Sequence, residues 1–114
     1  MSEDTAPRNE VVLVGRVTSV PEERILPSGD SICSFRITVD RDTGDGFDVV
    51  DCTAWTVRTR KSAASWQHHD IVEVTGALRR RFYRAGAGVS SACGVEVLRA
   101  RRLAPALTRQ RTRG

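Results

Sequence analysis

Arginines dominate the residues of this chain that could do chemistry. The 114 residues include 18 Lys and Arg, of which Lys61 is the single lysine, against 14 Asp and Glu. Residues 79–114 hold ten arginines and one acid, Glu96, whereas residues 1–78 hold 8 basic and 13 acidic side chains. A planar guanidinium both pairs with phosphate and stacks on bases, which an ammonium group does not do. The asymmetry favours a polyanion as partner of the C-terminal part, with the arginine-rich codon usage of a GC-rich genome as the alternative.

Two arginines and one tyrosine occupy alternate positions of the segment 70–83. This segment is predicted to be a strand, because apolar and polar residues alternate along it. The core-facing phase is Val72, Val74, Gly76 and Leu78. Successive side chains of a strand point to opposite faces, so Arg79, Arg81 and Tyr83 are expected to face outward together.

The same alternation along the predicted strand 48–57 can be applied to Trp55. If Cys52 and Ala54 face the core, Trp55 is exposed, which is a costly position for a tryptophan unless it binds something. Arg36, in the polar phase of the segment 31–40, and Arg41, at its end, are candidate phosphate contacts. Sites that bind unpaired nucleic-acid strands combine a positively charged surface with exposed aromatic rings.

Other chemistry has little support in the sequence. The chain contains no P-loop, no G-x-S-x-G motif and no acidic cluster suited to a nuclease, so no catalytic residue, cofactor or small-molecule substrate is expected. Cys33, Cys52 and Cys93 form no CxxC pair and are predicted to be small buried hydrophobic residues, not metal ligands. The longest apolar runs are strand-sized and the N-terminus resembles no secretory signal, so no membrane association and a cytoplasmic location are expected.

The elements that must position these residues are mostly strands. A short disordered lead is expected over 1–8, a single domain over 9–103, and a basic disordered tail over 104–114. Within the domain, strands are predicted over 9–20, 31–40, 48–57, 70–83 and 89–103, a loop over 21–30 and a short helix over 58–67. This order predicts an all-β fold, a five-stranded OB barrel with one short helix between strands 3 and 4.

Several blocks of sequence resemble the bacterial single-stranded DNA-binding protein family. They are NEVVLVGRV at 9–17, FRITVDR at 35–41, DVVDCTAW at 48–55 and DIVEVTGAL at 70–78. The resemblance spans roughly residues 9–103, and it depends on the order and spacing of the blocks together. An aromatic residue usual in the family is replaced by Val49, and the acidic C-terminal tip of the family is missing.

The resemblance implies sequence-independent binding and protection of single-stranded DNA in replication, repair or recombination. It also implies a homotetramer, and the missing acidic tip suggests an accessory paralogue. The expected DNA-binding residues are Arg36, Arg41, Trp55, Arg79, Arg81 and Tyr83. An OB-fold RNA-binding protein and a primosome-type protein-interaction module, with Trp55 buried in an interface, remain as alternatives.

Overall fold

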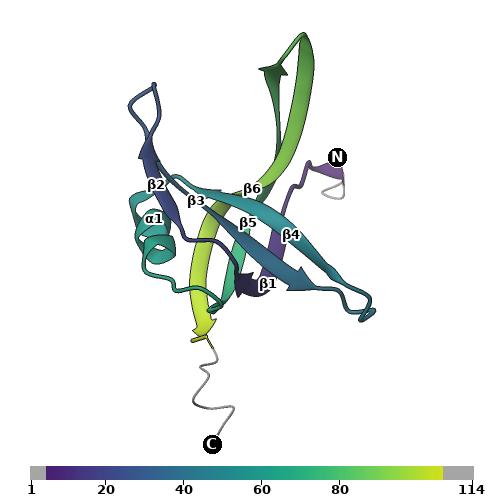
Figure 1. Cartoon of the computed structure of the whole chain (residues 1–114), viewed down its shortest axis with the longest axis vertical. Helices are drawn as coiled ribbons and strands as arrows, with labels where there is room; N and C mark the ends of the chain where they lie inside the picture. The colour runs from purple at the N-terminus through teal and green to yellow at the C-terminus, as the bar shows by residue number, and fades with distance from the viewer. Residues whose placement is uncertain (1–4, 107–114) are drawn as a thin grey trace, which may run out of the picture.

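Six strands and one helix make up the part of the chain that the structure describes (Figure 1). The structure is a computed structural model, and it describes residues 5–106. The elements are β1 (Val11–Val17), β2 (Glu22–Ile25), β3 (Ser31–Asp40), β4 (Phe47–Ala54), α1 (Val57–Ala64), β5 (Ile71–Ala85) and β6 (Gly88–Ala104). Residues 1–4 of the expected lead (1–8) and residues 107–114 of the expected basic tail (104–114) lie outside the described residues. No helix within residues 5–106 is long and apolar enough to cross a membrane.

Five of the strands pair in a closed ring. β1 pairs with β5, β5 with β6, β6 with β4, β4 with β3, and β3 returns to the end of β1. All of these pairings are antiparallel except that between β4 and β6. The predicted all-β fold of OB type, with its helix between the third and fourth strands of the ring, is confirmed.

Two glycines allow the strands of the ring to approach one another. β1 changes partner near Gly15, where a Cβ atom would overlap the carbonyl oxygen of Thr38 and lie 2.8 Å from Cγ2 of Ile37. On β5, a Cβ atom on Gly76 would overlap the carbonyl oxygen of Glu96 on β6. A side chain at either position would force neighbouring backbones apart, which is why glycine is required there.

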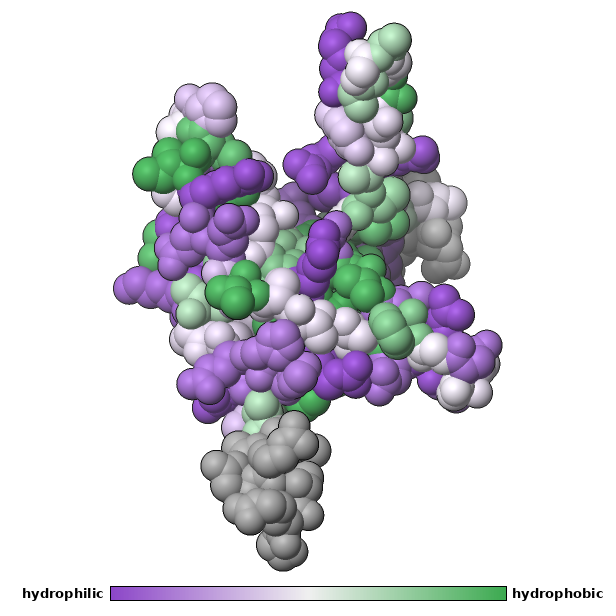
Figure 2. All heavy atoms as spheres, in the orientation of Figure 1, coloured by the Kyte–Doolittle hydropathy of each residue, from purple (hydrophilic) through white to green (hydrophobic). Residues whose placement is uncertain are grey.

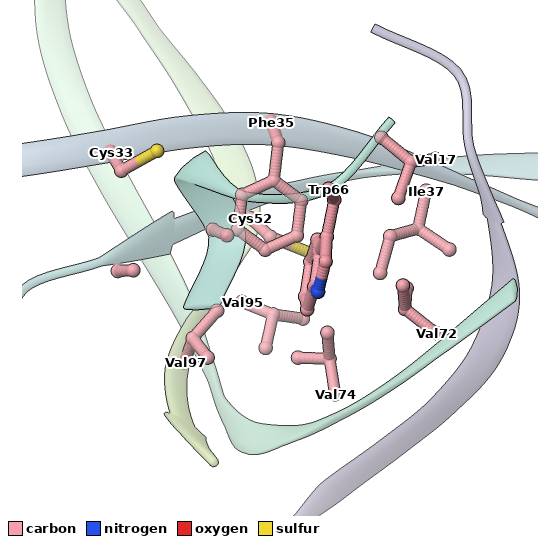
Figure 3. Close-up of a cluster of buried hydrophobic side chains, with 12 residues drawn as sticks. Val17, Cys33, Phe35, Ile37, Cys52, Trp66, Val72, Val74, Val95 and Val97 are labelled. Atoms are coloured by element: carbon pink, nitrogen blue, oxygen red, sulfur yellow. The ribbon is translucent and has the colours of Figure 1, made fainter. Parts of the chain in front are cut away.

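The interior of the ring is filled by alternate residues of each strand (Figure 3). Cys33, Phe35 and Ile37 of β3 are all buried, as the sequence pattern predicted. Trp66, which follows α1, is part of this core and packs with its ring edge-on to Phe35, at a centroid distance of 5.1 Å. Such aromatic pairs favour this arrangement because the positive edge of one ring meets the negative face of the other.

Two details of the predicted strands are wrong. The segment 21–30 was expected to be a loop, but residues 22–25 form β2, which pairs with β3 as the outer strand of a hairpin. Leu78 was expected in the core, but it is 50% exposed because β5 and β6 continue past the ring as a long hairpin. This hairpin turns tightly at Gly86, which has a φ of 58°.

Candidate functional site

The outer faces of neighbouring strands form one continuous surface. On β3 and β4, Phe35 and Cys52 face inward as a pair, so the adjacent pair Arg36 and Asp51 faces outward. On β5 and β6, Leu78 pairs with the inward-facing Val95, so Arg79 and Arg81 lie on the outer face, opposite Gly94 and Ala92. The register therefore brings side chains from distant parts of the sequence to one face of the ring.

Two hairpins rise above this surface and enclose a groove. Figure 2 shows a recess between the projecting β2–β3 hairpin and the projecting β5–β6 hairpin. Arg24 lines it from the first hairpin and Arg79 and Arg81 from the second, while Asp51 and Trp55 line it from the β4 side. We call this recess, together with the hollow described next, the hairpin groove.

The groove continues into a second hollow over β3. Arg36 and Glu22 line this hollow, and Arg81 lines both parts. Ser34, Asp51 and Thr53 are also common to both, so the two hollows form one path across the surface. A path of this kind, lined by guanidinium groups on both sides, suits an extended polyanionic chain.

The arginines of the groove differ in how they are paired. Arg36 donates from Nε to Oδ1 of Asp51 at 2.8 Å, and Arg79 donates from Nε to Oε1 of Glu96 at 2.8 Å. Arg80 donates from Nε and Nη2 to the hydroxyl of Ser91, at 3.3 and 3.1 Å, and so has a neutral partner. Arg24 and Arg81 form no ion pair with any residue of the described range 5–106. Their guanidinium groups are exposed on opposite sides of the groove and are available to an anion.

Trp55 supplies an exposed ring to the groove. It follows the buried Ala54 directly and is 41% exposed, as the alternation of β4 predicted. Its carbonyl oxygen accepts a hydrogen bond from Nε of Arg60 at 3.2 Å, and the side chain of Thr56 caps the helix that begins just after it. The start of α1 therefore fixes the backbone that carries the ring, which lowers the entropic cost of stacking a base on it.

The structure does not bring all six predicted residues together. Trp55, Arg79 and Arg81 line the first part of the groove and Arg36 lines the second. Arg41 lies at the β3–β4 hairpin, where it contacts Asp48 at 3.0 Å, and the hydrogen bond to Asp48 raises the pKa of Arg41. Tyr83 shares the outer face of Arg81 and is exposed, but it lies farther along the hairpin and lines neither part of the groove.

Three groove residues were missed or misjudged from the sequence. Arg80 was not among the predicted site residues, yet it lines the groove. Arg24 was assigned to a loop, although its place in β2 puts it on the groove; the PEER segment at 21–24, part of the family resemblance, was the available signal. Cys93 was expected to be buried, but it is exposed and lines the groove, because β6 extends beyond the ring at this point. Burial does raise the pKa of the Cys33 thiol, and it raises the pKa of Cys52 to about 12.

Comparisons with known proteins agree with this arrangement. The model of the single-strand binding protein family matches residues 8–98. Single-stranded DNA-binding protein B of Bacillus subtilis is 30% identical over 87 residues, which cover 72% of this chain and 77% of that protein. Single-stranded DNA-binding protein 2 of Streptomyces coelicolor is 32% identical over 88 residues, 69% of this chain but 44% of that protein. The chain thus spans most of the first relative and less than half of the second.

The structural comparison supports the fold independently of sequence. A Plasmodium falciparum SSB, solved in complex with ssDNA, superposes with a TM-score of 0.73 over 90% of this chain and 99% of that chain. The two sequences are 20% identical, so this similarity establishes the fold.

Proposed function

Because the chain belongs to the single-strand binding protein family, we propose that it binds and protects single-stranded DNA in the hairpin groove, without sequence preference and without catalysis. The observation that carries this proposal is the combination, in one open groove, of the exposed ring of Trp55 with the guanidinium groups of Arg24 and Arg81, which form no ion pair within residues 5–106. The names of the relatives describe the same ligand.

The arginines and the tryptophan of the groove contribute different kinds of contact. Guanidinium groups bind phosphates, which are present at every nucleotide, so these contacts carry no sequence preference. A base stacked on Trp55 contributes about 1–3 kcal/mol, and stacking accepts every base because every base has a π-face. A duplex keeps its bases stacked inside the helix, so ring contact favours unpaired strands.

We also propose that the protein works as a homotetramer in the cytoplasm, in replication, repair or recombination. Val12 and Val14 stand half-exposed on the outer face of β1, next to Thr75 and Glu73 of β5, where a second copy would cover them. Sedimentation equilibrium measures the mass directly. A species of about four chains is expected, and a stable monomer at all concentrations would contradict this part of the proposal.

Fluorescence titration with oligo-dT tests the binding. Trp66 is buried, so we expect its emission to stay constant and quenching on titration to report the environment of Trp55. We expect saturable quenching by oligo-dT, weaker binding of a duplex of the same length, and weaker binding of oligo-U. Failure to bind oligo-dT even in dilute buffer, or preference for the duplex, would overturn the proposal, and preference for oligo-U would indicate an RNA-binding protein.

A further inference from the structure

Two carboxylates stand among the arginines of the hairpin groove. Asp51 lies opposite Arg36 on the neighbouring strand, and Glu96 accepts from Nε of Arg79 across the β5–β6 ladder. Both acids line the groove itself. Each of these carboxylates therefore already accepts a hydrogen bond from one guanidinium donor. It also repels any phosphate that approaches Arg36 or Arg79, because both groups are negatively charged.

Folding alone does not account for the position of these acids. The side chains are 63% exposed for Asp51 and 34% exposed for Glu96, and each forms one ion pair within residues 5–106. Exposed pairs of this kind contribute little to stability, because water screens the charges. Asp70 provides a contrast, since it is buried and accepts hydrogen bonds from the backbone N–H groups of Gln67 and Ala106.

We infer that Asp51 and Glu96 are affinity-setting residues that compete with DNA phosphates for Arg36 and Arg79. This inference rests on the proposed function. In the free protein each acid occupies an Nε donor, and binding of DNA requires exchange of that carboxylate for a phosphate oxygen. The acids thus hold back two of the groove's arginines, while Arg24 and Arg81 remain available to make the first contacts. The result is binding that is weaker, and more readily reversed, than the arginine content alone would give.

Charge-neutral substitutions test the inference. Asp51→Asn and Glu96→Gln keep the size of each side chain and a carbonyl acceptor but remove the charge. Loss of one unit charge a few ångströms from a phosphate in a water-exposed site is expected to tighten binding of oligo-dT about 3- to 10-fold at low salt. Each arginine released to neutralise a phosphate steepens the slope of log K against log[salt] by about 0.7. The gain should therefore shrink between about 50 mM and about 300 mM salt.

Glu73→Gln is the matched control. Glu73 pairs with Nε of Arg101 at 2.9 Å between the same two strands, but it lines neither part of the groove. Its substitution removes the same charge from the whole protein, so unchanged affinity is expected. Circular dichroism and thermal melting confirm that all variants are folded. Because Glu73 lies beside Val14 on the face proposed to contact a second copy, sedimentation equilibrium must show that Glu73→Gln keeps the assembly of the wild type.

The outcomes separate the two claims. If wild type binds oligo-dT and the groove variants bind tighter while the control does not, the inference holds. Unchanged or weaker binding by Asp51→Asn and Glu96→Gln would overturn the inference alone, since weaker binding means that the acids orient the arginines for DNA. An equal gain in Glu73→Gln would overturn it as well, because the effect would then belong to net charge. Absence of binding by wild type would overturn the inference together with the proposed function.

Discussion

Replacement of Gly76 by alanine is expected to destabilise the whole ring of strands. The new Cβ atom would overlap the carbonyl oxygen of Glu96, and it would lie 2.9 Å from the carbonyl carbon of Glu96 and 3.0 Å from Cγ1 of Val95. Two of these three atoms belong to the backbone of β6, so no side-chain rotation relieves the overlap. β5 and β6 must separate at the point where the strands close the ring.

The size of the effect follows from the nature of the obstruction. Overpacking in a well-packed region costs about 1–3 kcal/mol, and obstruction by backbone places Gly76→Ala at or above the upper end of that range. For a domain of this size about 1 kcal/mol lowers the melting temperature by roughly 4–8 °C, so a decrease of about 10–20 °C is expected. The shape of the groove should also change, because the displaced segment of β6 carries Glu96, which lines it.

Gly88→Ala serves as the control for this measurement. Gly88 lies on the same hairpin, but a Cβ atom there meets nothing within 4 Å and its φ is not in the left-handed region. Its substitution is expected to change stability by less than about 1 kcal/mol. Thermal melting followed by circular dichroism, with chemical denaturation for the free energy, compares the two variants. A Gly76→Ala protein that melts within a few degrees of wild type would refute the close approach of β5 to β6.

Three further predictions concern the groove. Arg81→Ala should weaken binding of oligo-dT. It should also flatten the slope of log K against log[salt] by about 0.7 for each phosphate that Arg81 neutralises in the wild type. Equal slopes for variant and wild type would mean that Arg81 does not contact phosphate. Trp55→Ala should weaken binding by about 1–3 kcal/mol with little change in slope. It should also abolish the quenching, since the remaining tryptophan, Trp66, is buried; quenching that persists would place the base elsewhere. A thiol reagent at pH 8 should modify Cys93 alone in the folded protein, because Cys33 and Cys52 are buried and burial raises the pKa of both thiols, that of Cys52 to about 12. Saturating oligo-dT should slow the reaction, and a second fast thiol, counted by absorbance or mass, would contradict this.

Alternation of apolar residues predicted the core well where strands are covered on one face. Cys33, Phe35 and Ile37 are buried as expected, because a one-residue change of register would move all three into water. The same reasoning failed at Leu78, which keeps the inward phase but lies beyond the end of the ring. Alternation reports which face a side chain occupies, and it does not report whether anything covers that face.

Short exposed elements gave no such signal. β2 is four residues long and exposed throughout, so nothing in its sequence distinguishes it from a loop. It forms because the following segment turns back at Gly29, which has a φ of 95°, and offers β3 as a partner. Arg24 enters the groove through that pairing, which explains why it was missed.

The sequence by itself determined the five strands of the ring, most of the core and the cationic, partly aromatic character of one face, because these depend on residue types and on the two-residue period of a strand. The tertiary structure decided how those charges are paired. Arg36 meets Asp51 and Arg79 meets Glu96 through cross-strand register, while Arg24 and Arg81 line the groove from two hairpins that are far apart in the sequence. Pairing between strands is a long-range property set by turns, glycines and the closing of the ring, so the balance of charge within the groove follows from the fold and not from the sequence pattern.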